Sequence, residues 1–171
     1  PAHHRTKMTA SQGKVREGKG NAPSIHSNIA VPPESALQCT IAYNAHGGYC
    51  VPLSSRHRPA AQRILAGQVY EPQTIEFITK HAGSGDIVHA RTYFGDFLPA
   101  LSRACAPGNK VWACEPNPES YRCAAITCLL NGLENVFIHC ILDGLDVPER
   151  TADIFIEALE IKLADIGLVK I

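Results

Sequence analysis

Residues 85–118 read GDIVHARTYFGDFLPALSRACAPGNKVWACEPNP, and this stretch decides the fold. Apolar runs over 86–90 and 110–114 predict two strands, and residues 97–105 between them predict a helix. A Pro-Gly turn at 106–109 separates that helix from the second strand. Strands that are apolar throughout and alternate with helices are typical of a parallel sheet covered on its faces. The stretch therefore predicts an α/β fold.

The same alternation of strand and helix continues toward the C-terminus. It predicts a helix over 118–130, a strand over 136–140, a helix over 152–163 and a fourth strand over 168–171. The first of these helices has clear end signals: Asn117 can cap it, Pro118 suits its first turn, and Gly132 follows its end. We therefore expect a Rossmann-like parallel sheet with flanking helices.

The sequence before residue 83 has a different character. Two β-prone runs over 37–43 and 48–53 flank a turn of Asn, His and Gly, and they predict an N-terminal β-hairpin. Residues 59–65 and the segment that opens at Pro72 predict short helices. The expected organisation is a polar, disordered tail over 1–35, a hairpin and helical lead-in over 36–82, and a partial sheet domain over 83–171.

Composition and charge exclude several classes of function. The 16 Lys and Arg residues balance the 16 Asp and Glu residues, so nothing favours nucleic acid or an anionic membrane as partner. No apolar run reaches the roughly 20 residues of a membrane span, and no signal peptide is visible, so we expect a cytoplasmic protein. The 7 Cys residues are odd in number and form no Cys-x-x-Cys pair. We therefore expect buried thiols rather than disulfides, and no metal site.

Two segments at the carboxyl ends of the predicted strands are candidates for ligand binding, because open parallel sheets bind ligands there. The first is the turn over 90–96, where Gly95 would let the backbone approach a ligand closely. The second is Glu115, which follows the second strand and lies 20 positions after Gly95. An acid at this distance from a glycine loop is typical of a carboxylate that binds ribose hydroxyls. The spacing predicts an adenosine-type ligand without distinguishing among such ligands.

These segments resemble the FkbM family of methyltransferases. The stretch over 85–99 is similar to the family's first motif, and 111–118 is similar to its acidic second motif. Shorter likenesses lie at 69–72, 121–122 and 130–136, and the whole resemblance covers about residues 47 to 142. It implies a class I methyltransferase that uses S-adenosylmethionine to methylate a hydroxyl group of a sugar or another small molecule. The methyl acceptor, the catalytic base and the oligomeric state are left open.

The resemblance also implies which residues bind the cofactor. The loop over 90–96 would face the methionine part, Glu115 would hold the ribose, and Asn117 with the loop after Cys140 would lie near the adenine. Glu71 would reach the amino-acid end. The cofactor-binding residues that this implies are Glu71, Ala90, Arg91, Thr92, Tyr93, Gly95, Asp96, Glu115, Asn117 and Leu142, with Asp143 beside the last.

Two features depart from the family pattern. Arg91 stands where the family has Gly, and its side chain would resist a positive φ and would intrude on the cofactor. The chain also ends at Ile171, before the acidic residue and the Glu-Gly pair that follow the family's fourth strand. We therefore expect a C-terminally truncated domain that is poorly stable and inactive by itself.

Alternative interpretations stay open at this point. His89 and Asp96 lie near the loop as potential bases, but His89 can simply end a buried strand and Asp96 can cap the following helix. A non-catalytic remnant of a methyltransferase would fit Arg91 and the early end of the chain. A nicotinamide-dependent oxidoreductase shares the topology, but the sequence lacks Gly-x-Gly-x-x-Gly after its first strand.

Overall fold

The computed structural model describes residues 36–140 and 166–170. Its centre is a four-stranded parallel sheet in the order β5-β4-β3-β6. The strands are β3 (Asp86–Ala90), β4 (Val111–Cys114), β5 (Val136–His139) and β6 (Ile166–Lys170). The chain runs outward from β3 through β4 to β5, and β6 then lies on the other side of β3. The strand order therefore reverses at β3, which is where open α/β sheets form a crevice for a ligand.

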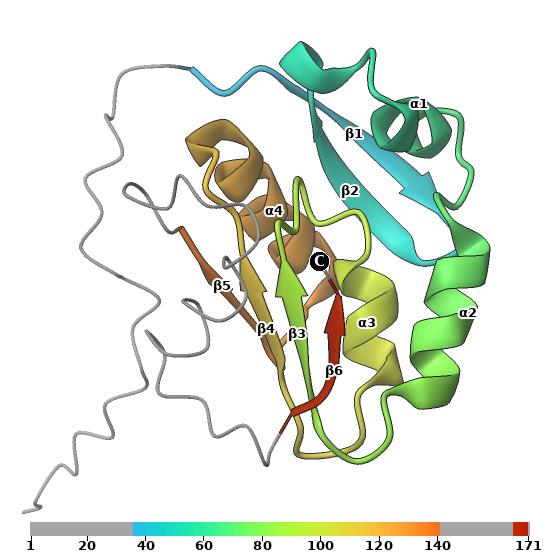
Figure 1. The fold of residues 1–171 in the computed structure, drawn as a ribbon. Coiled ribbons are helices and arrows are strands. Elements are labelled where there is room, and N and C mark those ends of the chain that lie inside the picture. Colours follow the sequence, from blue (N-terminus) through green and yellow to red (C-terminus); the bar gives the residue numbers. More distant parts are fainter. Residues whose placement is uncertain (1–35, 141–165, 171) are drawn as a thin grey trace, which may run out of the picture.

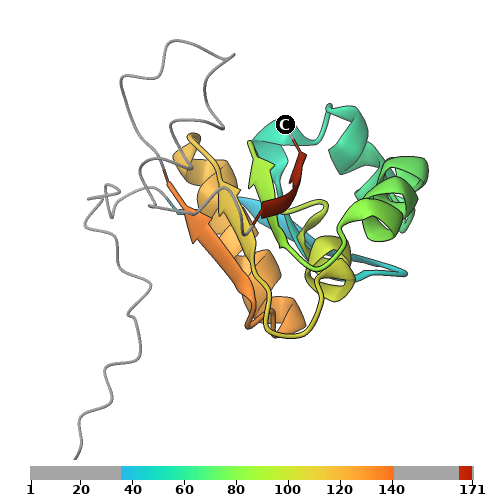
Figure 2. The ribbon, with the colours of Figure 1, turned by 60° about the horizontal axis from the view of Figure 1, so that its bottom comes forward.

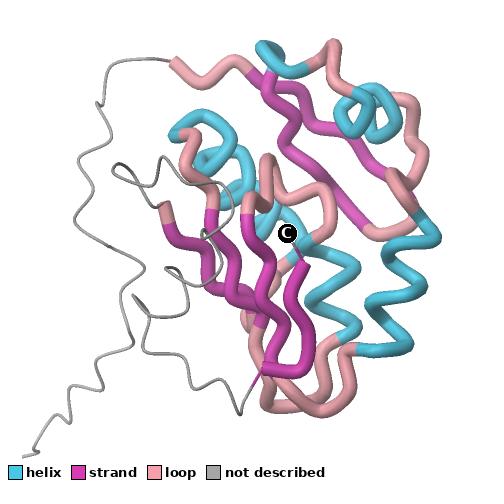
Figure 3. Tube along the Cα trace, in the orientation of Figure 1, coloured by secondary structure: helices cyan, strands magenta, loops and turns pink. Residues whose placement is uncertain are grey.

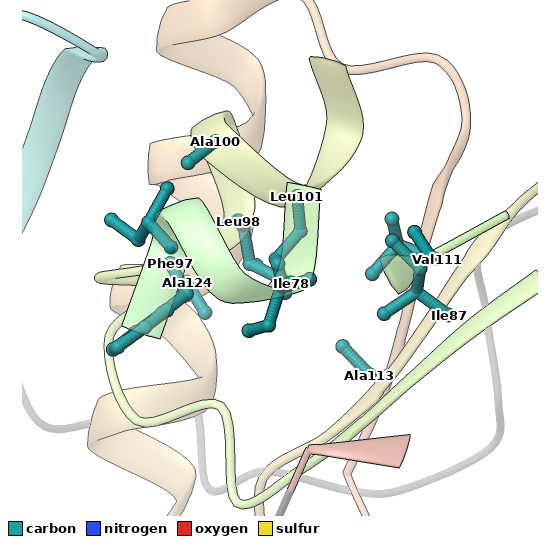
Figure 4. Close-up of a cluster of buried hydrophobic side chains, with 11 residues drawn as sticks. Ile78, Ile87, Phe97, Leu98, Ala100, Leu101, Val111, Ala113 and Ala124 are labelled. Carbon is teal, nitrogen blue, oxygen red and sulfur yellow. The ribbon is translucent and has the colours of Figure 1, made fainter. Parts of the chain in front are cut away.

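Three helices pack side by side on one face of this sheet (Figures 1 and 2). They are α2 (Pro72–His81), α3 (Leu98–Ala104) and α4 (Pro118–Asn131). Figure 4 shows Ile87 and Val111 of the strands facing Leu101 of α3 across the core. The strands bury apolar side chains at successive positions, as expected where helices cover a parallel sheet. The predicted α/β fold with flanking helices is confirmed.

A smaller unit lies beyond the carboxyl ends of the strands (Figure 3). It consists of the antiparallel hairpin β1 (Cys39–Asn44) and β2 (Gly47–Pro52), the short 3-10 helix η1 (Leu53–Ser55) and α1 (Pro59–Leu65). Tyr49 and Val51 of β2, Ile64 of α1 and Cys123 of α4 share a second buried cluster with Phe94. Through this cluster the hairpin packs against α4 and against the loop that follows β3.

The predicted elements agree closely with the observed ones within the described residues. The hairpin is present, α1 has the predicted bounds, α2 opens at Pro72, and β3 has the predicted bounds. Gly132 ends α4 in the left-handed conformation, with φ of 59°. The predicted helix over 152–163 and the predicted tail over 1–35 lie outside the described residues. None of the helices within 36–140 is long and apolar enough to cross a membrane.

Candidate functional site

An open pocket of about 600 Å³ lies at the carboxyl ends of β3, β4 and β6. It has the size of a small-molecule site and sits where the strand order reverses. The predicted site residues that line it are Glu71, Arg91, Tyr93, Asp96, Glu115 and Asn117. The pocket thus brings together residues from the segment before α2, the loop after β3 and the turn after β4.

The loop between β3 and α3 has an unusual backbone. Arg91, Tyr93 and Gly95 have φ values of 58°, 55° and 83°. The Thr92 N–H donates to the Cys114 carbonyl at 2.8 Å, so the hydrogen bonding between β3 and β4 extends into the loop. Arg91 therefore occupies a left-handed position that glycine adopts without strain, and its side chain lines the pocket. Arg91 thus adopts the positive φ that its side chain disfavours, while its intrusion on a cofactor stays a prediction.

Glu115 is held rigidly at the end of β4. Its Oε2 accepts from the Tyr93 N–H at 2.7 Å, and its Oε1 accepts from the Asn117 N–H at 2.9 Å. Burial raises the pKa of the Glu115 carboxyl, while these two N–H groups and the Arg91 guanidinium lower it. Each carboxylate oxygen keeps a second lone pair after accepting one N–H. Glu115 is therefore preorganised to accept further hydrogen bonds from a ligand in the pocket.

Asn117 has a structural role that the sequence predicted. Its side-chain oxygen accepts from the Ser120 N–H at 2.9 Å and caps the N-terminus of α4. The same residue lines the pocket beside Pro116. The cap fixes the direction in which the turn after Glu115 leaves the sheet, so it positions one wall of the pocket.

Asp96 lies in the pocket wall, and the prediction that it caps the following helix is wrong. The N-cap of α3 is Phe97, and no side chain makes a capping hydrogen bond there. Asp96 is 9% exposed, and burial raises the pKa of its carboxyl to about 7. Lys170 and the backbone N–H groups of Asp96 and Phe97 lower this pKa, and Glu71 raises it further. The carboxyl is therefore partly protonated near neutral pH.

Several predicted site residues lie behind the pocket rather than in its wall. Ala90 and Thr92 are buried and do not line it. A Cβ at Gly95 would lie 3.4 Å from the Ala124 backbone and 3.3 Å from the Thr127 side chain of α4. The absence of a side chain at Gly95 thus permits close packing against α4, and the close approach of Gly95 to a ligand stays a prediction. Leu142 and Asp143 lie outside the described residues.

His89 is a core residue, as the structural alternative for it predicted. Its ring is 2% exposed, lies 3.0 Å from the Thr92 hydroxyl through Nδ1, and packs against Phe97. Burial, with a smaller contribution from the Lys170 charge, lowers the pKa of the imidazole to about 3. His89 is therefore neutral at physiological pH and does not reach the pocket.

Other pocket residues were not predicted from the sequence. The hairpin unit contributes Ser55, Arg58, Pro59 and Ala60, and the remaining wall includes Tyr70, Phe97, Ser120 and Lys170. The segment around Arg58 carries no ligand-binding pattern of its own, so only the packing of the hairpin unit reveals it. The sequence did contain a signal for Lys170, because this residue stands at the carboxyl end of a predicted parallel strand, where ligands bind. Among the described residues, no group of three or more His, Cys, Asp or Glu side chains could hold a metal ion.

Comparisons with known proteins give only partial likenesses. No family model matches the chain. A 2,3-bisphosphoglycerate-independent phosphoglycerate mutase from Lachnoclostridium phytofermentans is 46% identical over 41 residues, which is 24% of this chain and 8% of that protein. The chain therefore spans a small part of this relative's length, and the match assigns no family.

Similar solved structures include methyltransferases. The N-terminal domain of EvdMO1 with SAH bound is 23% identical, with 40% of this chain and 28% of that chain covered and a TM-score of 0.36. A SAM-dependent methyltransferase from Aquifex aeolicus is 21% identical over 47% of this chain and 42% of that chain, at a TM-score of 0.37. TYW2 of P. horikoshii in complex with MeSAdo is 18% identical over 70% of this chain and 42% of that chain, at a TM-score of 0.44. The chain spans less than half of each structure.

Proposed function

We propose that this chain is the cofactor-binding part of an S-adenosylmethionine-dependent methyltransferase that methylates a hydroxyl group of a sugar or another small molecule. The observation that carries the proposal is Glu115, whose carboxylate is fixed by two backbone N–H groups beside a pocket at the strand-order reversal. A rigid carboxylate at this place suits the two hydroxyls of a ribose. The resemblance of 85–99 and 111–118 to the FkbM family supports the choice of cofactor.

In this proposal the chain's residues mainly bind and orient. Glu115 accepts hydrogen bonds from the ribose hydroxyls without reorganising, because the Tyr93 and Asn117 N–H groups already hold its carboxylate in place. S-adenosylmethionine, when bound, supplies a methyl group already activated by the positive charge of its sulfonium. Arg58 and Pro59 of the hairpin unit also line this pocket. The proposal thus names a small-molecule hydroxyl as the methyl acceptor and a small-molecule substrate as the partner.

Arg91 favours a second candidate, a methyltransferase-like protein without turnover. Its guanidinium lines the same pocket as Glu115 and lowers the pKa of that carboxyl electrostatically. A cation here pairs favourably with the carboxylate end of the cofactor but opposes a nearby sulfonium. Binding of the demethylated product S-adenosylhomocysteine with little or no binding of S-adenosylmethionine would identify this second candidate.

Calorimetric titration of S-adenosylmethionine and S-adenosylhomocysteine into the chain tests the proposal. We expect both to bind, and Glu115→Gln to weaken both by about 10-fold or more, because it removes a charged acceptor of buried hydrogen bonds. Glu76→Gln is the matched control, since Glu76 is exposed on α2 and pairs with Lys80. Binding of NAD instead would indicate an oxidoreductase. No binding of any of the three ligands would contradict the proposal.

A further inference from the structure

Asp96 is a second buried acid in the wall of the pocket, besides Glu115. Glu115 is held by two backbone N–H groups of neighbouring turns, and Glu71 lies on the exposed side. Asp96 is more than nine-tenths buried and still lines the pocket. No role in the proposed binding of the ribose requires a buried acid at this place, so its position calls for a separate explanation.

The sheet places Asp96 along the pocket from Glu115. Glu115 follows β4, the loop that leads to Asp96 follows β3, and Lys170 ends β6, and these three strands are neighbours in the order β4-β3-β6. Neighbouring strands are about 4.8 Å apart, so the end of β6 at Lys170 lies roughly 10 Å from the end of β4 at Glu115, and the Lys170 charge acts on Asp96. In the proposed binding mode the adenine lies near Asn117 and the methionine part faces the loop over 90–96, so the 5′ substituent of a nucleoside held at Glu115 extends toward Asp96.

The surroundings of Asp96 suit a positive charge. Tyr70 and Phe97 meet edge to face with ring centroids 6.2 Å apart, and both line the pocket. The Lys170 Nζ lies 4.9 Å from the centroid of the Phe97 ring. Aromatic faces and a buried carboxylate both attract cations. The Lys170 ammonium already lies there, so a cationic ligand binds Asp96 against the charge of Lys170.

We propose that Asp96 makes this pocket select a ligand with a positively charged 5′ substituent, and so favours the sulfonium of the methyl donor over the neutral thioether of the demethylated product. This inference rests on the proposed function. It adds a specificity-determining residue to the site, and it gives the product a reason to leave, because the charge that Asp96 attracts is lost when the methyl group is transferred.

The inference predicts a dependence on pH. The charged and titratable groups around Asp96 are Tyr49 of β2, Tyr70 and Glu71 before α2, Tyr93 of its own loop and Lys170 of β6. Because burial raises the pKa of Asp96 to about 7, a cationic ligand that binds the ionised form must displace a proton near neutral pH. Affinity for S-adenosylmethionine relative to S-adenosylhomocysteine should therefore rise as the pH rises from 6 to 8.

The test measures both dissociation constants by calorimetry between pH 6 and pH 8, in buffers of different ionisation enthalpy. For the wild-type chain we expect proton release when S-adenosylmethionine binds. We also expect the ratio of the affinities for S-adenosylmethionine and S-adenosylhomocysteine to rise by about 10-fold from pH 6 to pH 8, which corresponds to one pKa unit. Asp96→Asn should abolish both effects. The amino group that both ligands carry also titrates, and the comparison with Asp96→Asn removes its contribution.

Two further variants sharpen the result. Lys170→Met should move the rise in preference to higher pH, because the Lys170 charge lowers the pKa of Asp96. Glu76→Gln, which changes an exposed acid of α2 outside the pocket, should leave the proton release in place. Binding of both ligands with the same pH dependence in wild type and Asp96→Asn would overturn the inference alone. Failure of both ligands to bind the wild-type chain at every pH would overturn the proposed function with it.

Discussion

At the scale of the residue, Arg91 carries backbone strain that a glycine would remove. Its φ of 58° is left-handed, which costs a residue with a side chain roughly 1–2 kcal/mol. We expect Arg91→Gly to raise the free energy of unfolding by about 1 kcal/mol, part of the gain being offset by the flexibility of glycine in the unfolded chain. Urea denaturation measures the change. Arg91→Ala is the control, because it removes the guanidinium and keeps the strain. An equal gain from alanine would show that charge is the cause.

Individual residues were predictable where the reason for them is local. The place of Glu115 followed from its distance to Gly95, and the cap at Asn117 followed from the residues next to it. The packing of Gly95 against α4 was not predictable, because its neighbours Ala124 and Thr127 are distant in sequence. For Asp96 the sequence offered both a place in the site and a cap on the following helix, and its neighbouring residues could not decide between them.

At the scale of the element, side chains of α4 make hydrogen bonds to the backbone groups on the open edge of β2. The Thr127 hydroxyl accepts from the Cys50 N–H at 3.0 Å and donates to the Phe94 carbonyl at 2.9 Å. The Asn131 side chain accepts from the Gly48 N–H at 3.0 Å and donates to the Gly48 carbonyl at 2.6 Å. Two polar side chains of a helix thus take the place of a neighbouring strand, and one of them also holds the loop after β3.

Thr127→Val should therefore be strongly destabilising although it preserves the shape of the side chain. It leaves the buried Cys50 N–H and Phe94 carbonyl without their partner, which costs about 2–4 kcal/mol for the two groups together. Thr127→Ser keeps the hydroxyl and should cost less than half as much. Chemical denaturation gives both values. Similar losses for valine and serine would mean that the methyl group, rather than the hydroxyl, matters at this position.

The bounds of the elements could be predicted because Pro, Gly and Asn mark the ends of helices by local chemistry. Pro72 and Pro118 open helices in their first turns, and Gly132 closes one. The docking of α4 on β2 could not be predicted, because Thr127 and Asn131 look like solvent-facing positions in a helical pattern. Their partners lie about 80 positions earlier, at Gly48 and Cys50.

At the scale of the whole molecule, the alternation of strands and helices was enough to predict a parallel sheet. It did not predict that the hairpin unit lies over the strand ends, because the pattern of strands and helices does not indicate which element the hairpin packs against. The buried cluster of Tyr49, Ile64, Phe94 and Cys123 fixes that placement through contacts between distant segments. The pocket therefore forms where the hairpin unit packs against the sheet unit. The side of the pocket that the hairpin unit contributes is the part that the sequence patterns did not predict.

The stability of the whole molecule should depend on two buried groups whose pKa values shift in opposite directions. The pKa of His89 falls from 6.5 to about 3, so the unfolded chain binds more protons and stability falls as the pH falls through this range. The pKa of Asp96 rises from 3.8 to about 7, so the folded chain binds more protons and stability falls as the pH rises through that range. Between pH 4 and pH 6.5 the two effects oppose each other and nearly cancel.

Asp96→Asn removes one of these two effects and leaves the other. Relative to wild type, the variant should lose about 1.4 kcal/mol of stability for each unit by which the pH falls from 6.5 to 4, because the contribution of His89 is no longer offset. Urea unfolding at several pH values measures this difference.

Other groups with shifted pKa values, such as His46 and Glu115, are present in both proteins and drop out of the comparison to first order. The exposed control Glu76→Gln should follow the wild-type curve. Parallel curves for wild type and Asp96→Asn would show that the Asp96 carboxyl does not hold its proton in the folded chain, which would also remove the basis for its role in choosing a cationic ligand.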